Sequence, residues 1–297
     1  MDYRTFIKRK IDEDSGKIAA MSDRIWEIAE IRYQEERSSQ LQISALLDEG
    51  FTVERNVAGM PTAFIASYGT GAPVIGILGE FDALENLSQK ANEFSPKRRE
   101  NNGNGHGCGH NALGTAALYG AVAVKKYLEQ CGKTGTVKYY GCPAEEGGSG
   151  KTFMVRAGCF HGLNAALTWH PNYYTSTIKT GSLANVRCVF TFYGVSSHAA
   201  AAPHLGRNAL SAVELMNIGV NYLREHLLPG TLVHYAVTNA GGDAANIIQE
   251  EAEVVYAVRA PEVAQIEKMT ERIQKIAQGA ALMTETTVKS RTVSGYS

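Results

Sequence analysis

The sequence lacks an excess of charge of either sign and lacks any long apolar run. Its 297 residues include 29 lysines and arginines against 30 aspartates and glutamates, a formal net charge of −1. This balance provides no electrostatic attraction to nucleic acid or to an anionic membrane. No run of about eighteen apolar residues is present, and the charged N-terminal segment has no apolar signal core. We therefore expect a cytoplasmic protein that binds neither nucleic acid nor a membrane.

Cysteines are few and irregularly spaced, which argues against a disulfide framework. Their odd number, five, is typical of reduced thiols in a cytosolic enzyme. Only Cys108 lies in a motif, so we expect the other four to be ordinary core residues. The one short basic run, residues 97–99, follows Ser-Pro in a polar stretch, and we expect it to be a solvated loop.

The first 180 residues predict helices and short strands that alternate. Apolar residues at three- and four-residue spacing predict helices within residues 6–33, 38–50 and 111–130. Strands are predicted at residues 51–54, 62–68, 74–78, 136–143 and 165–169. The strand at 74–78 is a continuous apolar run, as expected of a strand buried in a sheet, and the strand at 165–169 is also expected to be buried. This pattern predicts an α/β fold with a mixed, mostly parallel sheet and flanking helices.

From residue 181 the organisation of the chain changes. Strands are predicted at 186–193, 231–238, 251–259 and 285–292, with helices at 208–226 and 262–281. This β-α-β-β-α-β order is the ferredoxin-like arrangement. A chain of this length also predicts about two domains. We therefore expect a boundary near residue 180, between domains at 1–180 and 181–297.

Side chains able to bind a metal follow three of the predicted strands. Asp82 follows the strand at 74–78, Glu145 and Glu146 follow the strand at 136–143, and His170 follows the strand at 165–169. In an open α/β sheet, ligands bind outside the carboxyl ends of the strands. These side chains are therefore expected to share one crevice.

A glycine-rich segment, Asn-Gly-His-Gly-Cys-Gly-His-Asn at residues 104–111, is the strongest local motif. Thiolate and imidazole groups suit zinc and its first-row neighbours. Cys108 and His110 are two residues apart, so in extended backbone they project to the same side. The alternative is a glycine-rich turn with two solvated histidines.

Together, Cys108, His110, Glu146 and His170 offer more ligands than one structural zinc needs. A hydrolytic centre with two ions fits better, because two ions can polarise a carbonyl and acidify a water. Such a centre needs a base that is not a ligand, and the adjacent Glu145 can fill that role. The alternative for Glu145 and Glu146 is a solvated pair in a loop.

Two further residues, Asp82 and His106, lie near these positions. Asp82 is expected to accept a hydrogen bond from a ligand imidazole and fix its tautomer, although it could instead cap a helix. His106 has no clear role, because enough ligands are already present.

Four ordered motifs resemble one known family. They are Gly-Glu-Phe-Asp-Ala-Leu at 79–84, Gly-His-Gly-Cys-Gly-His-Asn at 105–111, Pro-Ala-Glu-Glu-Gly at 143–147 and Trp-His-Pro at 169–171. The sequence resembles the amidohydrolase branch of the metallopeptidases that includes carboxypeptidase G, aminoacylases and auxin-conjugate hydrolases. Residues 105–111 and 246–250 most resemble the group that hydrolyses aminobenzoyl-glutamate.

The resemblance implies a function and a set of roles. The implied reaction is hydrolysis of the amide bond in N-acyl or N-aroyl amino acids, with aminobenzoyl-glutamate favoured. Two divalent ions, manganese or zinc with cobalt as a third candidate, would be held by the positions that match family ligands: Cys108, His110, Glu146 and His170. Glu145 matches the general base and Asp82 the supporting acid. Relatives have a histidine at the position of Glu80, and Cys108 compensates for its absence here.

The resemblance also implies that residues 181–297 form a lid and dimerisation domain, with a homodimer or a related partner subunit expected. His198 matches a histidine that helps to hold the substrate carbonyl, although it could be an ordinary surface histidine. Arg207 and Arg259 are weaker candidates for binding a substrate carboxylate.

In the family the chain returns from the lid to the catalytic domain and supplies a last histidine ligand. This sequence ends at Ser297, so we expect the C-terminal part of the catalytic domain to be absent. The alternative function is therefore a non-catalytic metal-binding or dimerisation protein. A purely structural zinc domain is disfavoured, because the ligands spread over roughly sixty residues instead of lying in short knuckles.

Overall fold

The computed structural model describes residues 2–99, 102–177 and 181–296, and they divide into two compact units, Met1–Ser176 and Thr177–Ser297. Residue 180, where we expected the boundary, lies outside the described residues. Within the described ranges, no helix has both the length and the apolar character needed to cross a bilayer.

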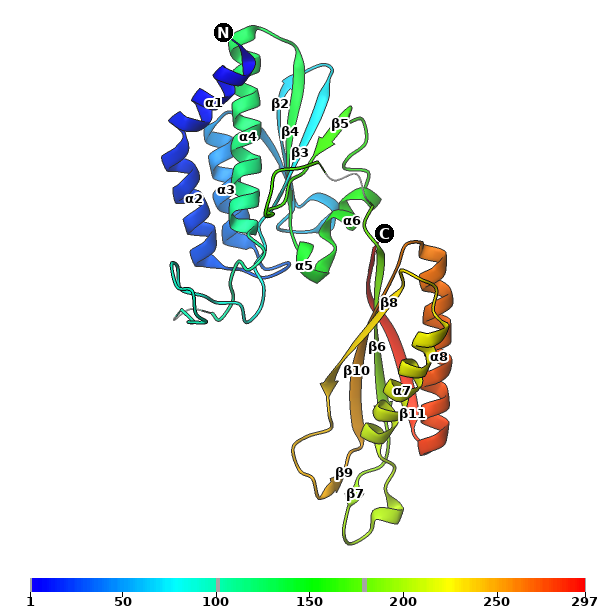
Figure 1. Ribbon diagram of the computed structural model, residues 1–297. Helices are drawn as coiled ribbons and strands as arrows, with labels where there is room; N and C mark the ends of the chain where they lie inside the picture. Colours follow the sequence, from blue (N-terminus) through cyan, green and yellow to red (C-terminus); the bar gives the residue numbers. More distant parts are fainter. Residues whose placement is uncertain (1, 100–101, 178–180, 297) are drawn as a thin grey trace. The chain divides into compact units, whose positions relative to one another are not determined.

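Unit 1 is built on a five-stranded mixed sheet, which confirms the predicted fold class (Figure 1). Its strand order is β1 (Thr52–Arg55), β2 (Phe64–Thr70), β4 (Gly135–Cys142), β3 (Val74–Glu80) and β5 (Ala165–Leu167). β3 pairs in parallel with β4 and β5, whereas β2 pairs antiparallel with β1 and β4. The parallel strands are those whose carboxyl ends lead into the predicted site residues.

Helices cover one face of this sheet (Figure 1). They are α1 (Tyr3–Glu13), α2 (Ser15–Ile28), α3 (Glu36–Asp48) and α4 (His110–Cys131). Ile25, Leu46 and Leu118 lie on their buried sides and pack in one cluster with Phe64 and Tyr139 of the sheet, all 0% exposed. Full burial of such side chains stabilises the fold by roughly 1.5–3 kcal/mol each, so this cluster fixes the helices against β2 and β4.

The other face of the sheet is covered by shorter segments, the 3-10 turn η1 (Val57–Gly59) and the helix α6 (Gly150–Arg156), while the short helix α5 (Glu145–Gly148) follows the end of β4. Met154 of α6 is buried there against Leu78 and Tyr140. The prediction of a buried strand at 165–169 is wrong in one respect: β5 exists, but its residues are exposed, and Leu167 is 57% exposed. β5 pairs only with β3 among the described strands, so it forms an edge of the sheet.

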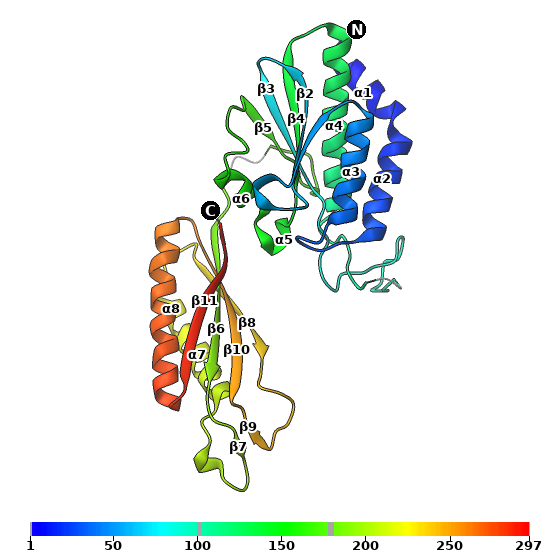
Figure 2. The ribbon, with the colours of Figure 1, turned by 180° about the vertical axis from the view of Figure 1, so that it is seen from behind.

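Unit 2 has the predicted β-α-β-β-α-β order. Its antiparallel sheet has the order β11 (Thr287–Tyr296), β6 (Ala184–Tyr193), β10 (Glu251–Ala260) and β8 (Leu232–Asn239). α7 (Ala209–Leu223) and α8 (Val263–Thr284) lie on one face of that sheet (Figure 2). Short segments complete the unit: β7 (Ser197–His198), η2 (Pro203–Leu205), η3 (Arg224–His226) and β9 (Ile247–Ile248).

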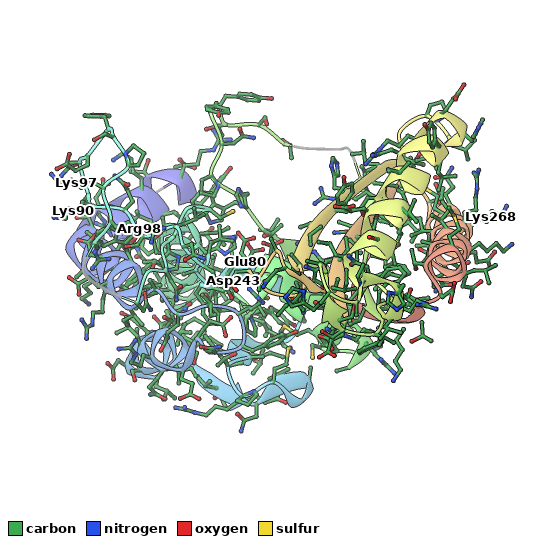
Figure 3. The ribbon with its side chains drawn as sticks, turned by 90° about the horizontal axis from the view of Figure 1, so that it is seen from below. Glu80, Lys90, Lys97, Arg98, Asp243 and Lys268 are labelled. Atoms are coloured by element: carbon green, nitrogen blue, oxygen red, sulfur yellow. The ribbon has the colours of Figure 1, made fainter. Side chains whose placement is uncertain are left out.

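The basic run at residues 97–99 lies in the loop between β3 and α4, as predicted. Figure 3 shows Lys90, Lys97 and Arg98 projecting from this loop. Lys97 Nζ forms an ion pair with Glu93 at 2.7 Å, and the Arg99 guanidinium stacks over the Trp26 ring at 3.9 Å. Lys97 and Arg99 therefore both make contacts within unit 1, as expected of a loop.

Candidate metal centre

His110 is the first residue of α4 and is fully buried, because α4 packs against the end of β3. Gly114, one turn later, lies so close to the Glu80 carbonyl that no Cβ would fit there. His110 Nδ1 lies 2.9 Å from Asp82 Oδ1, and the other Asp82 oxygen accepts a hydrogen bond from the Glu146 backbone N–H at 2.8 Å. A proton on Nδ1 facing the carboxylate leaves Nε2 free to bind a metal.

The free side of His110 faces acids. Its Nε2 lies 3.1 Å from Glu80 Oε2 and 3.9 Å from Glu145 Oε2. Nε2 of His110 and Oε2 of Glu80 are both buried, and their contact lacks the geometry of a hydrogen bond. Two buried polar atoms that face each other without a well-formed hydrogen bond are unusual in a native interior and are expected where an ion binds. The donor set therefore fits a divalent cation.

A sulfur and a second imidazole complete the cluster. Cys108 Sγ lies 3.1 Å from His170 Nε2. The candidate ligand atoms of Cys108, His110 and His170 lie within 4.8 Å of one another, and so do those of Glu80, His110 and Glu145. The two groups share His110, so they lie side by side, and the mixture of sulfur, nitrogen and oxygen donors suits first-row divalent ions.

Burial and neighbouring carboxylates shift the pKa values of Cys108 and His110. Burial raises the pKa of Cys108 to about 12, helped by its hydrogen bond to Glu146 and by the charges of nearby acids. Burial lowers the pKa of His110, but the Asp82 and Glu80 carboxylates outweigh it and raise the value to about 10. The site thus concentrates negative charge around one thiol and one imidazole, the electrostatic environment that favours a bound cation.

Glu80 is held by Lys151 of α6, whose ammonium forms an ion pair with Glu80 Oε1. Burial alone would raise the pKa of Glu80, but the neighbouring His110 and Lys151 outweigh it and lower the pKa to about 2. Glu80 is only 6% exposed, so its side chain lies in the interior of unit 1. The pair therefore presents an ionised carboxylate to the site.

The two groups of candidate ligands include neither His106 nor the two arginines named from the sequence. His106 Nε2 lies 3.1 Å from the Ile25 carbonyl oxygen of α2, so this ring is engaged away from the ligands. Arg207 Nε donates to Glu285 at 2.7 Å, whereas Arg259 is exposed on β10. Both arginines belong to unit 2.

His198 also belongs to unit 2, where it lies on β7. Its Nδ1 accepts hydrogen bonds from the backbone N–H groups of Ala200 and Ala201 at 3.2 and 3.1 Å. When Nδ1 accepts, the proton of a neutral imidazole resides on Nε2. His198 is exposed, so this Nε2–H can donate to a ligand.

Comparison with known proteins identifies the family. The sequence profile of "Peptidase family M20/M25/M40" matches residues 76–295, a range that includes every residue of the cluster. The chain belongs to this family. It is 53% identical over 289 residues to one of the subunits of the p-aminobenzoyl-glutamate hydrolase of Escherichia coli strain K12, covering 97% of this chain and 60% of that protein. It is 31% identical to a mouse Xaa-Arg dipeptidase, over 94% of this chain and 63% of that enzyme.

Solved structures show the same fold. The aminobenzoyl-glutamate utilization protein of Klebsiella pneumoniae superposes with a TM-score of 0.70 at 18% identity, over 98% of this chain and 78% of that one. A dinuclear metal binding peptidase of the M20 family from Bacillus subtilis superposes with a TM-score of 0.62 at 21% identity, over 97% and 74%. The chain spans about three fifths of the length of the curated relatives above.

Sequence reasoning missed three residues of this M20 site. It gave no role to Glu80, although Glu80 is two residues before Asp82, and alternate residues of a strand share a face. It also missed Lys151, which forms an ion pair with Glu80. The third residue that it missed is Glu35. Glu35 is 0% exposed and accepts hydrogen bonds from the Ala144 N–H at 2.8 Å and the Thr62 hydroxyl at 3.0 Å. Lys151 and Glu35 are both far in sequence from the residues that they contact.

Glu35 should make the stability of unit 1 depend on pH. Burial raises its pKa to about 7, and the nearby Asp82 charge adds to the effect. Between about pH 4.5 and 7 the folded state therefore binds more protons than the unfolded state, so this group's contribution to the unfolding free energy falls as pH rises. The full difference corresponds to about 3 kcal/mol.

Glu35→Gln removes this titration. We compare the unfolding free energies of metal-free variant and wild-type protein. We expect the value of the variant minus that of the wild type to increase by about 3 kcal/mol between pH 4.5 and pH 8. Both tryptophans, Trp26 and Trp169, lie in unit 1, so their fluorescence during urea unfolding measures that unit. A difference between the two proteins that stays constant with pH would show that Glu35 does not titrate in this window.

Proposed function

We propose that this M20 protein hydrolyses the amide bond between an acyl or aroyl group and an amino acid, with p-aminobenzoyl-glutamate as the favoured substrate. The observation that carries the proposal is the buried pair His110 Nε2 and Glu80 Oε2, which face each other without a well-formed hydrogen bond where two groups of candidate metal ligands share His110. The relative that is 53% identical, which belongs to a p-aminobenzoyl-glutamate hydrolase, supports the choice of substrate.

In this proposal two divalent ions, Mn²⁺ or Zn²⁺ with Co²⁺ as a third candidate, are bound by Cys108, His110, Glu146 and His170. Asp82 fixes the His110 tautomer through the 2.9 Å contact with Nδ1. Glu80 adds a carboxylate that the sequence did not predict as a ligand. Bound ions would polarise the scissile carbonyl and increase the acidity of water in the site.

Glu145 acts as the general base. Its carboxylate lies 3.9 Å from His110 Nε2, beside the ligands, and its side chain is 43% exposed, so water and substrate can reach it. Burial and the Glu80 charge raise the pKa of Glu145, which makes the carboxylate a better proton acceptor. Glu145 takes a proton from water as the water oxygen bonds to the carbonyl carbon, and returns it to the amine nitrogen as the C–N bond breaks.

Unit 2 is proposed to be the lid and dimerisation domain, and unit 1 the N-terminal part of the catalytic domain. The Nε2–H of His198 is oriented by its own backbone contacts to donate to a substrate carbonyl oxygen as that oxygen gains charge. We further propose a homodimer through unit 2, or a complex with a related protein. In support of the latter, the chain is also 27% identical to another of the E. coli p-aminobenzoyl-glutamate hydrolase subunits. We propose a cytoplasmic location.

Release of p-aminobenzoate from p-aminobenzoyl-glutamate, measured by chromatography, tests the proposed function. We expect hydrolysis by protein loaded with Mn²⁺ or Zn²⁺, complete loss after treatment with EDTA, and recovery when the ion is returned. Acetyl-amino acids and Xaa-Arg dipeptides serve as comparison substrates. Protein that binds the ions and leaves every one of these amides intact would contradict the proposal and favour a metal-binding protein without activity.

A further inference from the structure

We propose that Tyr33 and Glu35 are positioning residues that fix the acidic turn, residues 144–149, in the conformation that places Glu145 and Glu146 in the metal centre. This inference rests on the proposed function of those two acids. Tyr33 and Glu35 belong to the α2–α3 connection, residues 29–35, which lies more than a hundred residues before the turn. They would act through the backbone of the turn and without contact to substrate.

The acidic turn has a backbone that needs external support. Ala144 has φ 56° and Ser149 has φ 59°, so the residues at both ends of the turn lie in the left-handed region. Residues with a Cβ rarely adopt that region, and they keep it only where the surroundings impose it. Gly147, with φ 76°, is the one position where the chain supplies a glycine for this purpose. Contacts from outside the turn must therefore hold the rest.

Glu35 provides the contact at the start of the turn. Its Oε1 accepts the Ala144 N–H at 2.8 Å, directly before Glu145. Its Oε2 accepts the Thr62 hydroxyl at 3.0 Å, which orients the carboxyl group. The side chain is fully buried, so water cannot replace either bond. A buried N–H left without this partner would be destabilising, which favours the left-handed conformation of Ala144.

Tyr33 provides the contact at the end of the turn. Its hydroxyl donates to the Gly148 carbonyl oxygen at 2.5 Å. The ring lies so close to Gly148 that a Cβ there would come within 2.9 Å of a ring carbon. Tyr33 itself has φ 63°, so its position is imposed by the connection and not by local preference. The turn is therefore held at Ala144 and at Gly148, on either side of the two acids.

The same connection also contacts the segment that carries Asp82. The Ala83 N–H donates to the Glu30 carbonyl oxygen at 2.8 Å, and Ile31 forms a parallel β-bridge with Ala83. The Glu30 carboxylate accepts the Ser38 N–H at 2.9 Å, which ties the connection to the start of α3. One segment thus sets the separation between Asp82 and the acidic turn, and the Glu146 N–H to Asp82 bond spans that separation.

Hydrogen exchange of residues 144–149 in metal-free protein tests the inference without requiring bound metal. Tyr33→Phe removes one hydroxyl, and Glu35→Ala removes both acceptors. We expect amide exchange in the turn to rise about tenfold in each, as for loss of one hydrogen bond. Glu35→Gln keeps an oxygen for Ala144 and gains an NH₂ for the Thr62 hydroxyl, so we expect it to behave as wild type. Tyr68→Phe, which loses a bond to Glu129 elsewhere in unit 1, is the matched control.

Zn²⁺ affinity by titration calorimetry then shows whether the turn positions the ligands. We expect affinity to fall about tenfold in Tyr33→Phe and Glu35→Ala, within the range found for groups that orient metal ligands. Unchanged exchange and unchanged affinity in Tyr33→Phe would overturn the inference, even if Glu35→Ala does not fold. The inference would also be contradicted if Glu35→Gln lost as much Zn²⁺ affinity as Glu35→Ala. If the wild type binds no ion, the proposed function fails, and the exchange result alone decides the inference.

Discussion

Replacing Glu145 with glutamine should abolish nearly all hydrolysis and leave the bound metal in place. Glutamine preserves the size of the side chain but cannot accept the proton of the attacking water. The loss of a positioned general base typically costs about 10²–10⁴-fold in rate. We expect kcat for p-aminobenzoyl-glutamate to fall by that factor with little change in KM, because Glu145 acts on water and not in binding the substrate.

The matched control for this variant is Glu13→Gln, which changes a glutamate on α1 that is half exposed and pairs only with neighbours on its own helix. Its rate should equal that of the wild type. Metal content of both variants, measured by mass spectrometry, must stay at the wild-type level for the comparison to be valid. If Glu145→Gln retains metal and turns over at more than a tenth of the wild-type rate, Glu145 is not the base.

Cys108→Ala should weaken metal binding by at least about 100-fold. Loss of a group that merely orients a ligand costs about 10–100-fold in affinity, so loss of the only thiolate in the cluster should cost no less. Among the residues that the structure describes, Cys108 is the cysteine that groups with His110 and His170, and its Sγ lies 3.1 Å from His170 Nε2. Competition of Zn²⁺ between the protein and a chromogenic chelator measures the change.

Cys131→Ala is the control for Cys108→Ala, since Cys131 is an exposed thiol at the end of α4. Its Zn²⁺ affinity should match that of the wild type. Far-ultraviolet circular dichroism of the metal-free variants shows whether unit 1 still folds. Equal affinity in folded Cys108→Ala and wild-type protein would remove Cys108 from the ligand set and leave the acids and histidines alone.

Local pattern was enough to predict most of the elements. Apolar spacing predicted α3, α4 and the order of strands and helices in unit 2, because buried faces repeat with the period of the element. The burial of β5 was predicted wrongly, because an apolar run of that kind indicates a strand without showing how many neighbours it has. An edge position depends on the sheet as a whole, which no local window contains.

The site was partly predictable for a related reason. Residues that follow parallel strands meet at one edge of the sheet, so Asp82, Glu145 and His170 could be placed together from their positions alone. The contacts of Lys151 with Glu80 and of Glu35 with Ala144 join residues 71 and 109 positions apart. Nothing in the spacing of single residues predicts such pairs, because they depend on how α6 and the α2–α3 connection pack.

The electrostatics of the cluster could not have been derived from the sequence either. Glu80 could be taken only as a substitute for an absent histidine. In the structure it is a buried carboxylate that His110 and Lys151 keep ionised, with one oxygen on Lys151 and the other 3.1 Å from His110 Nε2. Its role depends on burial and on one cation from another helix, and both are properties of the fold.

The number of metal ions bound per chain is the most direct test of the central claim that unit 1 contains a metal centre. Protein purified under reducing conditions, without chelators, is dialysed separately against Mn²⁺ and Zn²⁺, and its metal content is measured by mass spectrometry. We predict two ions per chain, held by Cys108, His110, Glu146 and His170, in the cluster where two groups of candidate ligands meet at His110. Protein that retains no ion after either dialysis, with unit 1 folded, would contradict the account.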